Sequence, residues 1–350
     1  MPDQQFLQFK RGEMWIEEEF HPEGGGSIPS GRVVFHTAGR LNATCDNVVW
    51  ICHALTANSN PGEWWPGFFE KNPLADPQRH FIICVNVPGS CYGSLGPLDL
   101  GDGTALYHRF PGLTIRDIVA VLQQVRKHLG INAIQTLMGA SMGGQQALEW
   151  SILEPGLIRH LVLLATNARH SEWGVAFNES QRWAIENDPS WPEYQACAGL
   201  EGMKLARSLA LLSYRSYRGY ALRQYQEFAF QRQRKVASYQ RYQGEKLAER
   251  FNAFSYHLLS RTMDSHDVGR DRGGTVNALS RIKACTLVLA LKGDLLFPAE
   301  EQQYLAEHIP EARYREIPSE FGHDGFLIET EKIKYQLNRV FTPVSENLKN

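Results

Sequence analysis

The chain has 350 residues, of which 43% are hydrophobic, and its formal net charge is −2. This length and apolar content are enough for a substantial core, either as one large domain with an insertion or as two domains. The near-neutral charge argues against a nucleic-acid partner, and no apolar run is long enough for a membrane span. We interpret the Arg-, Tyr- and Gln-rich stretch 215–241 as the solvated side of an amphipathic helix rather than an RNA-binding face.

The N-terminus and the cysteines indicate where the protein works. The first residues contain no signal-peptide apolar core, so we expect a cytoplasmic protein. None of the six cysteines forms a C-x-x-C pair, which argues against a zinc site, and the sequence calls for no metal or other cofactor. Cys52, Cys84 and Cys285 lie in apolar runs and are expected to be buried thiols, as in a reducing compartment.

The first half of the chain alternates between short apolar runs and helical patterns. A Gly/Pro-rich hairpin loop separates the first two of the strands expected at 13–20, 32–37, 47–55, 80–87 and 157–166. Amphipathic or helix-forming patterns predict helices at 114–130, closed by Gly130, and at 145–155, stopped by Pro155. Continuous Val- and Ile-rich runs are typical of strands buried on both faces, so a doubly wound, mostly parallel sheet is predicted.

The second half contains a change of character that predicts an insertion. From 168 to 281 the strand patterns vanish, and helical, aromatic and Arg-rich segments replace them. We expect this segment to form a helical lid over the C-terminal edge of the sheet, with 1–167 and 282–350 forming the α/β core. The strand pattern resumes at 285–298, followed by a helix at 300–309 and a last strand that leads into the loop with His323. Residues from about 342 onwards are expected to be frayed.

Residues 137–148, LMGASMGGQQAL, contain G-x-S-x-G between an apolar run and a helix-forming run. This is the sequence form of a nucleophile elbow, in which a tight strand-to-helix turn exposes a serine hydroxyl. Glycines at 139, 143 and 144 fit such a turn, and Ser141 lies at its tip. By itself the motif also fits an ordinary turn, so its partners decide the interpretation.

A serine hydroxyl is a poor nucleophile until an imidazole takes its proton and a carboxylate orients that imidazole. In this fold the order along the chain is Ser, acid, His. Asp294 follows the apolar run TLVLALKG, and His323 lies in FGHDGF after the last strand. With Ser141, both fall at one edge of the predicted sheet, where ligands bind in open α/β folds. We therefore predict a Ser141–His323–Asp294 triad.

Other residues compete for these roles. Asp264, His266 and Asp267 in MDSHDVGRDRGG lie inside the helical insertion, and a structural or hinge role is favoured for them. His53 in CHALTAN follows a strand but precedes the serine, so its loop is expected to help form an oxyanion hole instead. The backbone N–H groups of Met142 and Leu55 are the predicted oxyanion donors.

Six ordered blocks carry a resemblance to a known family: CHALTAN, NVPGSCYGSLGP, GASMGGQQALEW, MDSHDVGRDRGG, GDLLFP and FGHDGFLIE. Together they resemble the signature blocks of the homoserine O-acyltransferase (homoserine O-acetyltransferase) family, from about residue 13 to 335. The resemblance implies an α/β-hydrolase fold with Ser141, Asp294 and His323 as the triad. It also implies a homodimer joined through the lid helices.

The resemblance further implies a clamp for the amino-acid acceptor. The family's lid arginine and the tyrosine seven residues on resemble Arg207 and Tyr214 in ARSLALLSYRS, and the Asp after the catalytic His resembles Asp324. Arg207 would hold the acceptor's carboxylate and Asp324 its ammonium. A zwitterion needs one fixed cation and one fixed anion, and an arginine fork suits a carboxylate. Without the resemblance, both residues fit ordinary helix-surface and loop-capping roles.

The leading hypothesis is a ping-pong acetyltransferase that moves an acetyl group from acetyl-CoA to L-homoserine, in methionine biosynthesis. A succinyl-CoA donor stays open. An L-serine acceptor also stays open, because serine is one methylene shorter and a pocket discriminates one methylene by only about 1–3 kcal/mol. Arg109 and Arg116 are the cations considered for a succinyl tail. An esterase or thioesterase on the same scaffold is the alternative, since water can replace homoserine. A non-catalytic scaffold is disfavoured by the complete triad.

Overall fold

The computed structural model describes residues 8–341 of the chain. Eight strands form one sheet in the order β1-β2-β4-β3-β5-β6-β7-β8. In chain order they are β1 (Lys10–Ile16), β2 (Gly31–Ala38), β3 (Val48–Cys52), β4 (Phe81–Val85), β5 (Ile134–Ala140), β6 (Ile158–Leu164), β7 (Cys285–Leu291) and β8 (Arg313–Ile317). The β1–β2 and β2–β4 pairs are antiparallel and the other five are parallel, which confirms the mostly parallel sheet.

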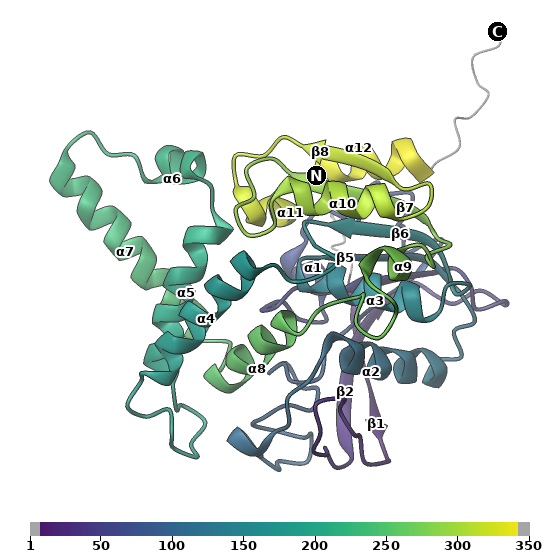
Figure 1. Ribbon diagram of the computed structural model, residues 1–350, viewed down its shortest axis with the longest axis horizontal. Helices are drawn as coiled ribbons and strands as arrows, with labels where there is room; N and C mark the ends of the chain where they lie inside the picture. Colours follow the sequence, from purple (N-terminus) through teal and green to yellow (C-terminus); the bar gives the residue numbers. More distant parts are fainter. Residues whose placement is uncertain (1–7, 342–350) are drawn as a thin grey trace, which may run out of the picture.

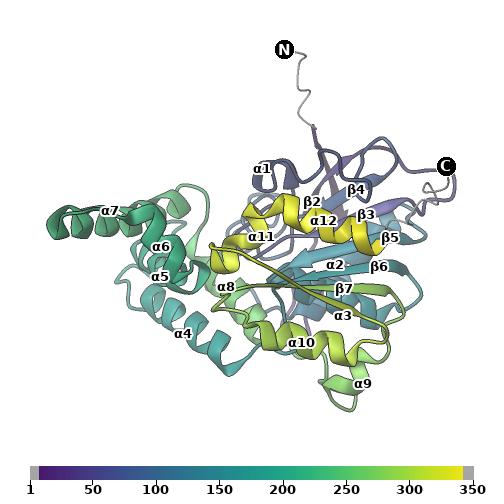
Figure 2. The same ribbon diagram turned by 90° about the horizontal axis from the view of Figure 1, so that it is seen from above.

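Helices cover both faces of the sheet, as expected for a doubly wound fold (Figures 1 and 2). The helices of the core are α1 (Pro61–Trp64), α2 (Ile115–His128), α3 (Met142–Leu153), α10 (Ala299–His308), α11 (Gly325–Ile328) and α12 (Thr330–Phe341), with short 3-10 turns η1 (Tyr107–Arg109) and η2 (Gly322–Asp324). Along β3, Val48 and Trp50 pack in the core cluster that contains α2 and α3. Val49 and Ile51 pack in the other cluster, which includes α12. This strand is buried on both sides, as its continuous apolar run predicts.

The boundaries of α2 follow from local chemistry. Thr114 and Asp117 form a reciprocal capping box at its start, and Gly130, with φ of 65°, follows its end. An apolar stripe faces the sheet, which explains why the helix is predictable from its period. The first strand lies earlier than predicted, because residues beyond Ile16 leave the ladder and only Phe20 makes an isolated bridge, to Ile28.

Six helices lie between β6 and β7, in the segment predicted as a lid. They are α4 (Glu172–Glu186), α5 (Leu200–Tyr214), α6 (Tyr217–Gln224), α7 (Ala229–Ala248), α8 (Ala253–Asp264) and α9 (Thr275–Leu279). The stretch 215–241 is mostly exposed, as predicted, but it forms parts of two helices rather than one, because α6 ends at Gln224 and α7 begins at Ala229. Figures 1 and 2 show α7 extending away from the rest of the protein. The exact limits of the insertion, 168–281, stay a prediction.

The chain enters and leaves the helical segment at one place, which we call the joint (residues 168–170 and 266–268). Arg169 and Asp267 form an isolated antiparallel bridge. The N–H of His170 donates to the carbonyl of His266 at 2.9 Å, and the N–H of Val268 donates to Ala168 at 3.0 Å. The two ends of the segment are therefore fastened to each other by backbone hydrogen bonds.

The expected burial of three cysteines holds for two of them. Cys52 and Cys84 are buried as predicted, whereas Cys285 is exposed, because it is the first residue of β7 at the open end of the strand. The predicted fraying from about residue 342 lies outside the described residues. Within residues 8–341, no helix is both long and apolar enough to cross a membrane.

Candidate active site

Ser141 lies in a strained turn between β5 and α3. Its backbone has φ of 57° and ψ of −127°, a combination that residues with side chains rarely adopt. Close packing around the turn explains the neighbouring glycines. A Cβ on Gly139 would lie 2.1 Å from the carbonyl oxygen of Gly143, and a Cβ on Gly143 would lie 2.1 Å from that of Cys52. The turn is therefore locked against the end of β3, and strain at the serine is maintained by its surroundings.

His323 and Asp294 form a buried hydrogen-bonded pair at the same edge of the sheet. His323 Nδ1 lies 2.7 Å from Asp294 Oδ2. The other carboxylate oxygen, Oδ1, accepts the backbone N–H groups of Leu296 at 2.9 Å and Phe297 at 3.0 Å. These contacts leave the carboxylate no other orientation, so Nδ1–H donates to it and Nε2 is left to accept a proton.

Aromatic rings hold the imidazole of His323 in place. The ring of Phe297 stacks on it with centroids 5.2 Å apart, and Phe326 meets it edge-on at 5.4 Å. The ring of Tyr214, from α5, lies 5.7 Å away. Aromatic side chains from the core and from the helical segment therefore surround the imidazole. They hold it in the cavity that it lines together with Ser141.

A cavity of about 530 Å³ opens onto Ser141 and His323, both of which line it. Ser141 is 5% exposed and His323 is 3% exposed, so their reactive atoms are reached only through this cavity. Among residues 8–341 no hydrogen bond joins the Ser141 hydroxyl to the imidazole. Such contacts are often loose in ligand-free enzymes and tighten when substrate binds.

His53 organises the loop that carries Leu55. Its Nδ1 donates to the carbonyl of Ala54 at 2.9 Å, and its Nε2 accepts the N–H of Val87 at 3.0 Å. Burial lowers the pKa of His53 to about 4, so the ring stays neutral and fits these two bonds. His53 is therefore a structural histidine, as its place before the serine predicts.

The loop held by His53 borders the cavity at Leu55, and Met142 begins α3 directly after the serine. The N–H groups at the start of a helix have no partner within the helix and point towards the turn that precedes it. Both predicted oxyanion donors thus lie in segments next to Ser141. Their role as oxyanion donors stays a prediction.

The three residues predicted as an acceptor clamp line the same cavity as the serine. Arg207 and Tyr214 lie on one face of α5, with the guanidinium carbon of Arg207 5.3 Å from the centroid of the tyrosine ring. Asp324 borders the cavity next to His323 and is 8% exposed. The structure therefore brings a cation and an anion to the cavity that holds the serine.

Arg215 is a neighbour of this group that the sequence analysis did not single out. Its Nε lies 2.6 Å from Asp324 Oδ2, although the angles of a hydrogen bond are not met. The contact balances the charge of Asp324, and Arg215 itself does not line the cavity. Its position directly after Tyr214 in LSYRS is the signal that could have identified it.

The competing acid, base and cation candidates lie elsewhere. Asp264 accepts Asn178 Nδ2 at 2.8 Å and pairs with Arg182 at 2.6 Å, and burial raises its pKa. Asp267 Oδ1 accepts the N–H of Gly269 at 2.8 Å. These carboxylates are occupied by structural contacts near the joint and do not line the cavity.

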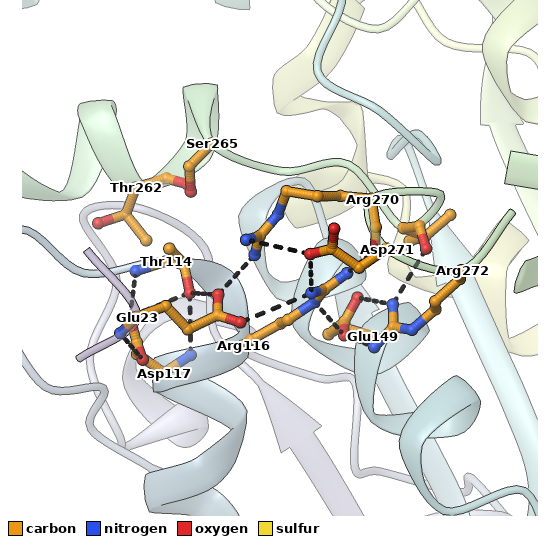
Figure 3. Close-up of polar contacts among 11 residues, drawn as sticks. Glu23, Thr114, Arg116, Asp117, Glu149, Thr262, Ser265, Arg270, Asp271 and Arg272 are labelled. Carbon is orange, nitrogen blue, oxygen red and sulfur yellow. Dashed lines mark hydrogen bonds and ion pairs between the residues drawn. The ribbon is translucent and has the colours of Figure 1, made fainter. Parts of the chain in front are cut away.

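Figure 3 shows a network of charged side chains around Glu149 of α3, the helix that follows Ser141. Glu149 of α3 is 1% exposed, and Arg116 Nε and Arg272 Nη1 lie 3.1 and 2.9 Å from its carboxylate oxygens. Glu23 of the hairpin loop lies 3.5 Å from Arg116 and also binds Arg270. Arg116 is thus committed to this network, and Arg109, the other cation considered for a succinyl tail, is exposed in η1 and does not line the cavity.

Two cations that the sequence analysis passed over do line the cavity: Lys246 on α7 and Arg250 just beyond its end. They follow the basic stretch whose charges we interpret as solvated, so composition gave no reason to separate them from their neighbours. Among the described residues, no group of three or more His, Cys, Asp and Glu is arranged to hold a metal ion.

Comparison with known proteins places these features in a family. Residues 47–330 match the model of the alpha/beta hydrolase fold. A homoserine O-acetyltransferase from Cyclobacterium marinum is 44% identical over 329 residues, which cover 93% of this chain and 94% of that protein. The crystal structure of a homoserine O-acetyltransferase from Staphylococcus aureus is 28% identical, with a TM-score of 0.80 and 98% of each chain covered.

The same architecture also occurs in a protein described as a hydrolase. An acetylester hydrolase from Corynebacterium glutamicum superposes with a TM-score of 0.83 over 97% of this chain and 99% of its own. At 23% identity that likeness concerns the fold alone. Fold similarity therefore does not separate transfer to an amino acid from transfer to water, and the residues of the cavity must do so.

Proposed function

The chain belongs to the homoserine O-acetyltransferase family of the α/β-hydrolase fold, and from this premise we propose that it acetylates the hydroxyl of L-homoserine. The observation that carries the proposal is the placement of Arg207 and Asp324 in the cavity that holds Ser141. Acyl transfer to water needs only the serine and its base. A fixed cation and a fixed anion beside them match an acceptor that is a zwitterion.

The first half-reaction acylates the serine. Ser141 Oγ attacks the thioester carbonyl of acetyl-CoA while His323 Nε2 takes the hydroxyl proton. The resulting oxyanion accepts hydrogen bonds from the N–H groups of Leu55 and Met142. Collapse of the intermediate breaks the C–S bond, His323 returns the proton to the sulfur, and CoA leaves with the acetyl group on Ser141.

The second half-reaction repeats these steps with homoserine. Arg207 holds its carboxylate and Asp324 its ammonium, which aims the side-chain hydroxyl at the acetyl carbonyl. His323 takes the hydroxyl proton, the oxygen attacks, and O-acetyl-L-homoserine leaves as the proton returns to Ser141. Asp294 stabilises the imidazolium in both halves. We assign the product to methionine biosynthesis, and the chemistry calls for no metal or prosthetic group.

Acetyl-CoA is the donor we favour over succinyl-CoA. A succinyl tail carries a carboxylate and would require a free cation near the acyl group. Arg116 is bound to Glu149 in the network of Figure 3, and Arg109 does not line the cavity. Of the three Lys and Arg side chains that line the cavity, Arg207 is needed by the acceptor, and Lys246 and Arg250 are exposed to solvent. L-Serine remains the alternative acceptor, because it carries the same two charges.

We also propose that the enzyme works in the cytoplasm as a homodimer joined through its lid helices. Exposed apolar side chains on these helices support the dimer: Leu205, Leu212, Leu222 and Phe230 are each more than half exposed. Such side chains on a helical arm are typical of a surface that a second copy covers. Sedimentation at several concentrations measures the assembly directly.

The decisive experiment is a panel assay. Acetyl-CoA and succinyl-CoA are each mixed with homoserine, serine or no acceptor, and free thiol is followed together with the acylated product. We expect the fastest thiol release with acetyl-CoA and homoserine, in step with O-acetylhomoserine. Release that is equally fast without an acceptor would favour the esterase or thioesterase alternative and reject the transferase.

A further inference from the structure

Lys246 and Arg250 give the wall of the cavity at α7 an excess of positive charge. Lys246 lies in the last turn of α7, and Arg250 follows in the turn just beyond its end. Both border the cavity that contains Ser141, and both are exposed, so they lie where the cavity opens to solvent. Neither has a place in the acyl-transfer steps or in the acceptor clamp.

The guanidinium of Arg250 is already oriented by the core. Its Nη1 donates to the carbonyl of Thr56 at 2.6 Å and contacts the hydroxyl of Tyr92. Both contacts use the same nitrogen. In the part of the chain that the structure describes, no hydrogen bond or ion pair is recorded for its Nε and Nη2. These two nitrogens form the edge that binds a phosphate through two parallel hydrogen bonds.

Two carboxylates near these cations, Glu63 and Glu245, bind other side chains. Glu63 lines the cavity, but its two oxygens accept the side-chain amides of Asn58 and Asn60, each at 2.9 Å. Glu245, beside Lys246 in the sequence, pairs with Lys204 at 2.9 Å.

The remaining acid, Glu249, forms no ion pair with Lys246 or Arg250 among the described residues. The amides that bind Glu63 are neutral, so its carboxylate keeps its charge. Even so, the cavity is lined by Arg207, Lys246 and Arg250 against Glu63 and Asp324, and Asp324 is paired with Arg215. This excess of positive charge favours an anionic ligand.

We propose that Lys246 and Arg250 form the subsite for the phosphate groups of the coenzyme A donor. The inference rests on the proposed function, because it takes the donor to be a CoA thioester. The phosphates would bind at the mouth of the cavity, while the pantetheine arm carries the thioester inward to Ser141. Because these phosphate contacts do not involve the reacting carbonyl, they are equally strong in the ground state and in the transition state. The subsite should therefore lower KM and leave kcat unchanged.

The test compares two donors that share the reacting thioester. Acetyl-CoA carries phosphates, whereas S-acetylpantetheine does not. In Lys246→Gln and in Arg250→Gln, we expect the ratio of kcat/KM for acetyl-CoA to that for S-acetylpantetheine to fall about fivefold, the range of an exposed ion pair. The difference should shrink as ionic strength rises. Arg241→Gln removes a cation from the exposed side of the same helix and should leave the ratio unchanged.

An unchanged ratio in Lys246→Gln would overturn the proposal. Equal losses with both donors in Arg250→Gln would show that this arginine acts through the Thr56 loop instead. Calorimetric titration of free CoA into Ser141→Ala, with and without Lys246→Gln, measures the subsite without any turnover. Equal affinities there would also overturn it. Failure of the proposed function is a separate result, namely wild-type enzyme that forms no O-acetylhomoserine from acetyl-CoA.

Discussion

The two walls of the cavity are built in different ways. On the core side, Ser141, Asp294 and His323 follow strand ends and are fixed by backbone hydrogen bonds, tight turns and stacked rings. On the side of the predicted lid, Arg207, Tyr214, Lys246 and Arg250 line the cavity, and we call this side the lid wall. Its long side chains are held by a few contacts with neighbours. The core wall suits chemistry that tolerates little displacement. The lid wall suits recognition, which can change by substitution of single side chains.

This contrast gives a rule for mutants. A change in the core wall should lower every acyl transfer, whatever the acceptor or donor. A change in the lid wall, or in Asp324, which the core contributes to the acceptor clamp, should alter the choice of partner and leave the remaining half-reaction in place. The following predictions test that rule, starting with the largest effect.

Ser141→Ala should lower CoA release at least about 10⁴-fold, because the covalent route is lost and only binding and oxyanion stabilisation remain. With acetyl-CoA alone, wild-type enzyme should gain one acetyl mass on the peptide that contains Ser141. Ser151→Ala is the matched control, since that buried serine on α3 bonds only the carbonyl of Ala147. Near-normal turnover in Ser141→Ala would end the acyl-serine mechanism.

Asp294→Asn should lower turnover about 10³- to 10⁴-fold, because an amide no longer selects the tautomer with Nε2 free. The loss should be equal for homoserine and for water. Asp264→Asn should mainly lower the melting temperature, since Asp264 pairs with Arg182 near the joint. The assignment would be wrong if folded Asp264→Asn were inactive and Asp294→Asn were not.

Arg207→Ala and Asp324→Asn should lower transfer to homoserine about 100-fold, because each leaves one charge of the acceptor unpaired in a partly closed cavity. Single-turnover acylation by acetyl-CoA should change far less. Rapid-quench measurements of both half-reactions, with exposed Arg261→Ala as control, separate the two effects. Equal losses in both halves would assign these residues to the fold or to donor binding.

Acid should weaken the fold in a defined window. Burial lowers the pKa of His53, His170 and His266 from 6.5 to about 4. Between pH 6.5 and 4 the unfolded chain therefore binds more protons than the folded protein. The contribution of these neutral histidines to the free energy of unfolding is complete above about pH 6.5 and is lost as the pH falls towards 4. Each histidine contributes up to about 3 kcal/mol to that free energy.

Melting curves from pH 7 to 4.5 measure this loss. We expect the pH dependence of the melting temperature to become shallower in His53→Gln, which alters the core wall, and in His266→Gln, which alters the joint. A comparison of the two variants shows which region limits acid stability. A melting temperature that stays constant over the whole range would contradict the prediction.

The core wall could be predicted almost completely from the sequence. The elbow at Ser141, the strand end before Asp294 and the loop with His323 are each encoded within a few residues. The lid wall could be predicted only in part. Arg207 and Tyr214 came from a family resemblance, and the contact of Arg215 with Asp324 joins residues far apart in the chain.

Two errors have the same physical origin. The basic stretch at 215–241 has helical composition throughout, and no Gly or Pro between Gln224 and Ala229 marks the break between α6 and α7. Lys246 and Arg250 have the same composition as solvated neighbours, and only the direction of α7 brings them to the cavity. Local patterns determine elements, whereas long-range packing determines which charges meet.

The joint has a consequence for how this protein can change. Because Ala168 and Val268 are hydrogen-bonded to each other, the helices between them form a closed excursion from the sheet. Such an excursion can lengthen, shorten or be exchanged for another while the strands keep their order and connections. A chimaera spliced at these two residues would exchange Arg207 and Tyr214 and would keep the core residues Ser141, Asp294, His323 and Asp324.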